Sequence, residues 1–559
     1  MRIAILLTLF ALFPLSAQEL SDLRTRAEIT DYVETSGYDD VVRLAKGIVE
    51  ASPLARYESF GTTEENRELP LLILSDPAVA TPEAGRKLGR PIVFVQANIH
   101  AGEVEGKEAA IILARRLTSG DLRPMLRELV VLIAPIYNAD GNEKVNVQNR
   151  TAQNGPVAGV GTRENSKGLD LNRDYMKLDS AEARALVGLM NRWDPHAAID
   201  LHTTNGSYHG YHLTYSPTLN PNADPRLLGL AREQILPAAQ QAVLKKHNFR
   251  TYYYGNFASE SGTARESSRV DPANPGDTVW RTFDHRPRFG NNYVGLRNRL
   301  AILSEAYSYL DFRGRVRVTE VFVEECLRAI AAHGRKLTAL TTQIDSETKT
   351  YDGVTNNKRG AATPPSLGVE FQIAALSSPV DILVGDVTNQ LNERSGREML
   401  VMSDQVVPVR MKDYGIFQPT RMVAMPAGWL IPKPHVESGR YAAAIERLRW
   451  HGLRVQRVSD SAQIDVQRFV IQSQSKSERV FQGHREARVV GRHENAKLSI
   501  QPGALFVPAN QPLARLAFYL LEAESDDGLV TWNYLGDGLV AGDTFHVYRV
   551  MSARVLKLE

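Results

Sequence analysis

The sequence predicts an α/β fold: a mixed, mostly parallel twisted sheet flanked by helices, followed by an α+β or β-rich domain. Three features of the 559 residues support this prediction. Between about residues 91 and 332, apolar runs alternate with helical patterns, as expected for a sheet covered by helices on both faces. A polar stretch at 341–365 ends this alternation, and strand-like segments dominate after it. We therefore expect one domain over residues 18–345 and an accessory domain of unknown role over residues 366–559.

Each element of the first domain follows from its local pattern. Short apolar runs predict strands at residues 91–99, 129–137, 197–201 and 300–307. Apolar residues at helical spacing predict helices at residues 38–51, 104–117, 181–191, 227–247 and 318–332. Segments rich in Gly, Pro, Asn and Arg at 142–172 and 255–292 predict long loops, which are usually functional in a compact domain.

The accessory domain contains one clear strand–helix–strand pattern. Its parts are residues 428–432, 439–451 and 455–458. Near the end of the domain, four carboxylates lie close together in the sequence: Glu522, Glu524, Asp526 and Asp527. Their spacing lacks a calcium-loop pattern, so we interpret them as a solvated acidic turn.

The first 17 residues have the pattern of a signal peptide. A basic tip precedes an almost wholly apolar run at residues 3–15, and Ser16-Ala17 supplies small residues for cleavage. This run is too short to cross a bilayer, which takes about 20 apolar residues. With no second apolar span in the sequence, we expect an exported protein, periplasmic or secreted, without a membrane span in its mature chain.

Composition excludes some partners. The 66 basic and 64 acidic residues nearly cancel, giving a net charge of +2, which argues against nucleic acid or a membrane surface as a partner. The single cysteine, Cys326, excludes an internal disulfide, and its surroundings predict a buried helix position. A large exported chain without disulfides fits a bacterial periplasm. The sequence gives no indication of oligomeric state.

Two histidines and one carboxylate follow predicted strands. His100 and Glu103 come just after the strand at 91–99, and His202 comes directly after the strand at 197–201. In open α/β sheets, ligands bind at the carboxyl ends of the strands. Two imidazoles and a carboxylate leave a fourth position for water, as in catalytic zinc sites. The set therefore predicts a metallohydrolase, although His202 alone is equally consistent with a histidine hydrogen-bonded at a strand end.

Further residues fit such a site. Glu305 ends the apolar strand at 300–307, and a partly desolvated carboxylate there can act as a general base. The alternative for Glu305 is a buried ion pair with Arg297 or Arg299. In the loop between the histidine-bearing strands, Asp170 could accept a hydrogen bond from the second ring nitrogen of His100.

The ordered motifs resemble the zinc carboxypeptidase family typified by carboxypeptidase A. They are His100-x-x-Glu103, Asn138-Ala139-Asp140-Gly141, Asn172-Arg173, His202 and Glu305. The spacings are 69 positions from Glu103 to Asn172, then 30 to His202 and 103 to Glu305. The resemblance covers about residues 25–335. Segments near the end of the accessory domain are similar to those that follow the peptidase domain in some large bacterial relatives.

The resemblance implies a function for each matching residue. His100, Glu103 and His202 would bind one Zn²⁺, and Glu305 would be the general base. Asn172 and Arg173 would hold the terminal carboxylate of a peptide or protein substrate. Arg150 matches the region of the arginine that polarises the scissile carbonyl, with Arg163 as a rival.

The family also uses a mobile tyrosine near the scissile bond. Tyr293 is the candidate here, although it precedes Glu305 by only 12 positions. The resemblance implies an exported zinc metallocarboxypeptidase. A related amidase or endopeptidase acting on cell-wall or modified peptides, or a non-catalytic peptide-binding protein, remain as alternatives. The residue preferred at the substrate terminus does not follow from the sequence.

Overall fold

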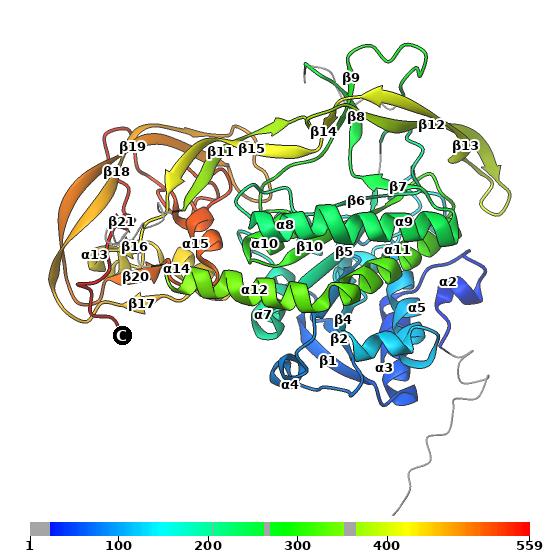
Figure 1. Cartoon of the computed structure of the whole chain (residues 1–559), viewed down its shortest axis with the longest axis horizontal. Helices are drawn as coiled ribbons and strands as arrows, with labels where there is room; N and C mark the ends of the chain where they lie inside the picture. Colours follow the sequence, from blue (N-terminus) through cyan, green and yellow to red (C-terminus); the bar gives the residue numbers. More distant parts are fainter. Residues whose placement is uncertain (1–22, 205, 262–268, 352–364) are drawn as a thin grey trace, which may run out of the picture.

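The computed structural model describes residues 23–204, 206–261, 269–351 and 365–559. The predicted signal peptide, residues 1–17, lies outside these ranges. No helix within them is both long and apolar enough to cross a membrane. An α/β domain and a C-terminal domain lie side by side, and a long β-hairpin extends from the second over the first (Figure 1).

The α/β domain is built on an eight-stranded mixed sheet in the order β1-β2-β4-β3-β5-β10-β6-β7. Its strands are β1 (Ala55–Thr62), β2 (Glu68–Leu74), β3 (Ile92–Ala97), β4 (Val130–Ala134), β5 (Ala197–Thr204), β6 (Leu213–Ser216), β7 (Thr251–Tyr253) and β10 (Leu300–Tyr307). The central strands β4, β3, β5 and β10 run parallel to one another. Their carboxyl ends therefore meet at one edge of the sheet, which confirms the predicted fold class.

Helices cover both faces of this sheet. Alternate residues of β3 point to opposite sides, so Val93 and Val95 belong to one hydrophobic core and Ile92 and Phe94 to the other. The first core is covered by α3 (Tyr38–Ala51), α5 (Glu105–Ser119), α8 (Pro225–Leu230), α9 (Leu236–His247), α11 (Phe312–Ala332) and α12 (Gly334–Lys349). Cys326 is buried in α11, as predicted. The second core is covered by α7 (Ala181–Trp193), α10 (Gly290–Leu296) and elements of the C-terminal domain.

Shorter helices connect these elements. They are α2 (Arg26–Ile29), α4 (Pro82–Lys87), α6 (Ala139–Asn142), η1 (Arg123–Arg127), η2 (Leu171–Arg173) and η3 (Ala231–Ile235). Part of the predicted polar boundary is helical, because α12 continues to Lys349. Leu337, Thr341 and Ile344 recur at helical spacing and are buried, which explains why the helix persists.

The C-terminal domain contains a six-stranded sheet in the order β17-β20-β16-β21-β18-β19. Its strands are β16 (Gly428–Ile431), β17 (Gln456–Arg457), β18 (Ala462–Lys476), β19 (Ala487–Ile500), β20 (Leu505–Pro508) and β21 (Tyr548–Val550), and its helices are α13 (Lys433–Glu437), α14 (Ala442–Trp450) and α15 (Ala514–Leu521). The predicted strand–helix–strand unit is present as β16, α14 and β17. However, β20 lies between its two strands and pairs antiparallel with both.

A hairpin arm leaves this domain and crosses the α/β domain (Figure 1). It consists of β12 (Val380–Asn392) and β13 (Arg397–Met411), preceded by β11 (Ser366–Ala374) and followed by β14 (Asp413–Tyr414) and β15 (Ile416–Ala424). β14 completes a small sheet with β8 (Asn256–Ser259) and β9 (Thr278–Arg281) of the α/β domain. Backbone hydrogen bonds join the arm to the loops after β5 and β10: Gly210 donates to Leu383 O at 2.8 Å and Met402 to Tyr309 O at 2.9 Å.

The two domains share one hydrophobic core. Phe94 of the central sheet and Tyr293 of α10 belong to the same cluster as Trp429, Phe518 and Trp532 of the C-terminal domain. Burial of such large side chains is the main favourable contribution to folding. The C-terminal domain is therefore packed against the sheet as part of its core.

The prediction of a solvated acidic turn is wrong. Glu522 accepts hydrogen bonds from the Trp429 indole at 2.9 Å and from Arg549 at 3.1 Å. Asp527 is fully buried and pairs with Arg288 at 2.8 Å. Buried carboxylates need such partners, and these arginines and the tryptophan are distant in sequence, so the local pattern could not reveal them.

Candidate metal centre and active site

The loop between β3 and α5 places His100 and Glu103 at the carboxyl edge of the sheet. Asn98 turns the chain there with a left-handed backbone conformation, φ +64°. The side-chain amide of Asn138, in the Asn-Ala-Asp-Gly motif, donates to Ile99 O at 3.3 Å and to Arg163 O at 3.2 Å. This motif thus ties the loop that carries His100 to the long loop before Asp170.

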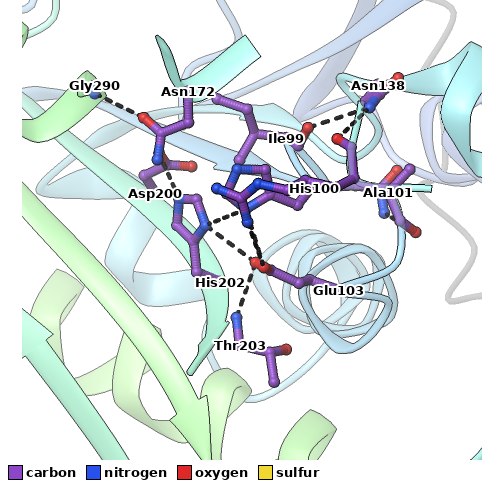
Figure 2. Close-up of polar contacts among 12 residues, drawn as sticks. Ile99, His100, Ala101, Glu103, Asn138, Asn172, Asp200, His202, Thr203 and Gly290 are labelled. Atoms are coloured by element: carbon purple, nitrogen blue, oxygen red, sulfur yellow. Dashed lines mark hydrogen bonds and ion pairs between the residues drawn. The ribbon is translucent and has the colours of Figure 1, made fainter. Parts of the chain in front are cut away.

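Three side chains converge at this edge (Figure 2). His202, on β5, turns Nδ1 toward His100 Nδ1 at 3.2 Å and toward Glu103 Oε2 at 3.0 Å. His100 Nδ1 lies 3.0 Å from Glu103 Oε1. All three residues are buried, and together they form a group with the donor atoms to hold a metal ion.

The geometry of this group fits zinc. Zinc–ligand bonds of about 2.0–2.1 Å in a tetrahedral site place neighbouring donor atoms about 3.3 Å apart. The two imidazole nitrogens and the carboxylate oxygens lie 3.0–3.2 Å from one another, close to that value. Two neutral imidazoles and one carboxylate leave room for a water or substrate atom, as in a catalytic site.

A carboxylate contacts the Nε2 atom of each histidine, on the side of the ring opposite the converging Nδ1 atoms. Asp170 Oδ1 lies 3.1 Å from His100 Nε2, and Asp200 Oδ2 lies 2.9 Å from His202 Nε2. Each pairing favours a proton on Nε2 and leaves the Nδ1 lone pair for a metal. Burial alone would lower the pKa of His202, but the carboxylates of Asp200 and Glu103 raise it well above its usual value.

Asp170 contacts other residues of the site besides His100. Its Oδ2 accepts from Arg163 Nε at 2.9 Å, and its Oδ1 accepts from the Asn172 N–H at 2.9 Å, which caps the short helix η2. Burial raises the pKa of Asp170, but His100, Arg163 and Arg173 together hold it well below its usual range. The carboxylate is therefore ionised throughout the physiological range.

Glu305 lies beside His202. The two residues are paired in register on the parallel strands β10 and β5, and the described part of the chain offers the Glu305 carboxylate no hydrogen-bond donor. The alternative partners are engaged elsewhere: Arg297 donates to Asn191 at 2.9 Å and Arg299 pairs with Asp345 at 2.8 Å.

The surroundings of Glu305 raise its proton affinity. Burial raises the pKa of Glu305 to about 8, and the Glu103 carboxylate acts in the same direction against His202, Arg150 and Arg163. A carboxyl group with a pKa near neutrality can both accept and return a proton.

Both candidate arginines lie at the site. Arg150 Nη2 forms an ion pair with Glu103 Oε1 and donates to Thr203 O at 3.4 Å. Arg163 Nη1 lies 3.4 Å from His100 Nδ1 and 4.0 Å from Glu103 Oε1, while its Nε stays on Asp170. The Arg163 side chain is 34% exposed and that of Arg150 is 18% exposed, so Arg163 is the more accessible to substrate.

Asn172 and Arg173 are on the helix η2 near the ligands. Asn172 Oδ1 accepts from the Gly290 N–H at 3.0 Å, which joins this turn to α10 (Figure 2). The Arg173 guanidinium stacks on the Phe289 ring at 3.9 Å, donates to Asn172 O at 2.7 Å, and remains partly exposed. This planar cation is held in place and has the fork of donors that suits a carboxylate.

Tyr293 does not join this group. It is fully buried in α10, and its hydroxyl lies 2.8 Å from His451 Nδ1 of the C-terminal domain. Its ring packs against Tyr175 and His451. The expectation of a mobile tyrosine at the scissile bond disagrees with this position, because moving Tyr293 would open the shared core.

The sequence interpretation missed Asp200 and Thr203. Asp200 precedes His202 by two positions, and residues i and i+2 of a strand share a face, so the spacing contained the signal. The Thr203 N–H donates to Glu103 Oε2 at 3.0 Å and fixes that carboxylate from the side of β5. A backbone N–H donor does not depend on the residue type, so the sequence cannot reveal it.

Several known carboxypeptidases are similar to this chain. The zinc carboxypeptidase family model matches residues 42–274. A carboxypeptidase 2 from Trichophyton rubrum is 22% identical over 512 residues, covering 89% of this chain and 83% of that protein. Carboxypeptidase D from Mus musculus is 29% identical over 201 residues, covering 32% of this chain and 14% of that protein. The solved metallo-carboxypeptidase from Pseudomonas aeruginosa gives a TM-score of 0.36 at 17% identity, covering 53% of this chain and 68% of its own.

An α/β sheet with two imidazoles and a carboxylate grouped at its carboxyl edge, and a further carboxylate beside them, has the arrangement of a metal-dependent hydrolase. The matched segment identifies the kind: over residues 42–274 this chain carries a zinc carboxypeptidase domain, and members of that family are hydrolases that use one zinc ion.

Proposed function

We propose that the protein is an exported carboxypeptidase that removes C-terminal residues from peptides, with His100, Glu103 and His202 as its zinc ligands. The observation that carries this proposal is the convergence of these three side chains within 3.0–3.2 Å, next to Glu305. Export rests on the signal-peptide pattern of residues 1–17.

The side chains around the ligands divide the reaction between them. A bound zinc ion would lower the pKa of a coordinated water and polarise the scissile carbonyl. Glu305 accepts the proton of the attacking water and returns it to the nitrogen of the leaving amine. Arg150 and Arg163 stabilise the negative charge that develops on the carbonyl oxygen.

Asn172 and Arg173 set the direction of attack. Arg173 provides a bidentate donor pair for the terminal carboxylate of the substrate, and Asn172 holds the turn that presents it. A substrate without that carboxylate loses this contact, so the enzyme should act from the C-terminus.

A peptide library tests the proposal directly. The purified mature protein should shorten free peptides from the C-terminus, residue by residue, when products are followed by mass spectrometry. A chelator should abolish the trimming, and zinc should restore it. The same peptides with C-terminal amides serve as the matched control and should remain intact. Internal cleavage, or equal cleavage of amidated peptides, would replace this proposal with an endopeptidase or amidase.

A further inference from the structure

The turn of the β18–β19 hairpin, Phe481 to His484, reaches from the C-terminal domain to the loop that supports the metal centre. Gln482, at its tip, accepts a hydrogen bond through Oε1 from the backbone N–H of Asp170 at 2.8 Å. This contact joins residues 312 positions apart in the chain. It ends on the residue whose carboxylate supports His100 and Arg163 and caps the Asn172–Arg173 turn.

The backbone of the turn is shaped for this contact. Phe481 and His484 exchange backbone hydrogen bonds of 2.7 and 3.0 Å across the turn. Both central residues have positive φ, +51° for Gln482 and +81° for Gly483. A two-residue turn of this kind favours Asn or Gly in its first central position, because a longer side chain is strained there. Glutamine in this position is therefore held in a conformation that it rarely adopts, and its contacts keep it there.

Charged contacts fix the flanks of the turn to the α/β domain. His484 Nε2 lies 2.9 Å from Asp179 Oδ2, in the same segment as Asp170. Glu486 pairs with Arg288 at 2.6 Å, next to the Phe289 ring on which Arg173 stacks. These contacts therefore fix the position of the turn relative to the loop that carries Asp170.

We propose that Gln482 is a positioning residue of the active site, supplied by the C-terminal domain. By fixing the Asp170 backbone, it keeps the Asp170 carboxylate aligned with His100 Nε2 and Arg163 Nε, and keeps the following turn aligned for the substrate carboxylate. The assignment rests on the proposed function, since it gives the C-terminal domain a part in zinc binding and in recognition of the substrate terminus.

Four variants separate this function from a structural one. Gln482→Met keeps the length of the side chain but removes the acceptor. Gln482→Glu keeps an oxygen in the same place. Gln482→Gly relieves the positive φ and removes the side chain. Arg485→Met changes an exposed residue of the same hairpin and is the control.

Two measurements are made on each full-length variant: the zinc dissociation constant by competition with a chelator, and kcat and KM on a peptide with a free C-terminus. We expect Gln482→Met and Gln482→Gly to weaken zinc binding and raise KM by about fivefold each, the effect of one lost neutral hydrogen bond. The melting temperature should not fall in Gln482→Gly. In Gln482→Glu, the zinc dissociation constant and KM should stay near their wild-type values, and Arg485→Met should match the wild type.

Unchanged zinc affinity and KM in Gln482→Met would overturn the proposal. So would equal losses in Arg485→Met, or a fall in melting temperature in Gln482→Gly that accounts for the loss of zinc. If the wild-type chain trims no peptide, the proposed function fails, whereas the zinc competition still decides whether Gln482 supports the metal centre.

Discussion

Glu305 and His202 occupy paired positions on neighbouring parallel strands, so the proposed general base and one proposed metal ligand are set in register by backbone hydrogen bonds. Neither residue depends on a flexible loop for its position. Rigid strands hold catalytic groups more accurately than loops do. The backbone separation of Glu305 and His202 is thus fixed by the sheet itself.

Replacing Glu305 tests this arrangement. Glu305→Gln keeps the shape of the side chain but cannot accept a proton, so kcat should fall by about 10²–10⁴-fold, the usual contribution of a general base. Steady-state kinetics on a free peptide measures the loss. Zinc content should stay at the wild-type level, because Glu305 is not among the three converging ligands. Wild-type kcat in this variant would exclude Glu305 as the base.

The supporting carboxylates should determine zinc affinity. Asp170→Asn and Asp200→Asn each remove the charge behind one histidine, and loss of such a partner typically weakens metal binding by about 10–100-fold. Competition with a chelator measures the dissociation constant. Asp121→Asn, a change at an exposed carboxylate, is the control. Equal affinity in all three variants would show that the histidines need no support.

Arg163 should matter more to catalysis than Arg150. Arg163 is anchored to Asp170 through Nε and places Nη1 3.4 Å from His100 Nδ1, whereas Arg150 is paired with Glu103. Arg163→Met should lower kcat by about 10²–10³-fold, as expected for removal of a donor to the oxyanion. Arg150→Met should lower kcat less, and kcat measured side by side decides the order.

Recognition of the substrate terminus should depend on Arg173. Arg173→Met keeps contact with the Phe289 ring but removes the donors for the substrate carboxylate. KM for free peptides should rise by about tenfold or more, because a hydrogen bond to a charged group contributes about 1.5–3 kcal/mol. The rate on amidated peptides, however slow, should not change. If the variant cleaves free and amidated peptides less efficiently by the same factor, Arg173 does not recognise the terminal carboxylate.

Acid should weaken the contact between the domains at Asp179. Burial raises the pKa of Asp179, but His484, Lys177, Tyr534 and Arg447 lower it below its usual value. A folded-state pKa below the unfolded value of about 3.9 means that the carboxylate contributes stability above that pH and loses it as the pH falls further.

Comparison with Asp179→Asn isolates this contribution. The variant should be less stable than the wild type at pH 7 by roughly 1–3 kcal/mol, the cost of leaving polar partners unsatisfied. The difference in free energy of unfolding should narrow below about pH 4. Urea unfolding of the metal-free proteins at pH 7, 5 and 3 measures it. A difference that does not depend on pH would contradict the assignment.

The sequence predicted the parts of the site that depend on local pattern. His100, Glu103 and His202 follow apolar strands, and their convergence follows from parallel strands that end at one edge. The support of His100 by Asp170 is confirmed at 3.1 Å. These relations need only strand periodicity and the rule that ligands bind at carboxyl ends.

Relations across the two domains could not be predicted in this way. Tyr293 is a tyrosine close to Glu305 in the sequence, as the resemblance requires. However, its hydroxyl contacts His451, which lies in the other domain and 158 positions away in the chain. From the sequence alone, the carboxylates after α15 would be expected to face solvent. Their burial depends on partners that are remote in the sequence, such as Arg288 of the α/β domain. No local periodicity carries information about which surfaces of two domains meet.

The order of strands in the C-terminal sheet also affects how early this sheet can form during synthesis. β21 (Tyr548–Val550) pairs with both β16 and β18, so it is an interior strand of its sheet although it comes after all the other strands of that sheet in the sequence. Until the ribosome has passed residue 550, β16 and β18 lack their shared neighbour, and the hairpin that carries Gln482 lacks a completed sheet behind it. The nascent chain therefore contains all three proposed zinc ligands, the last of them His202, about 350 residues before β21 is complete.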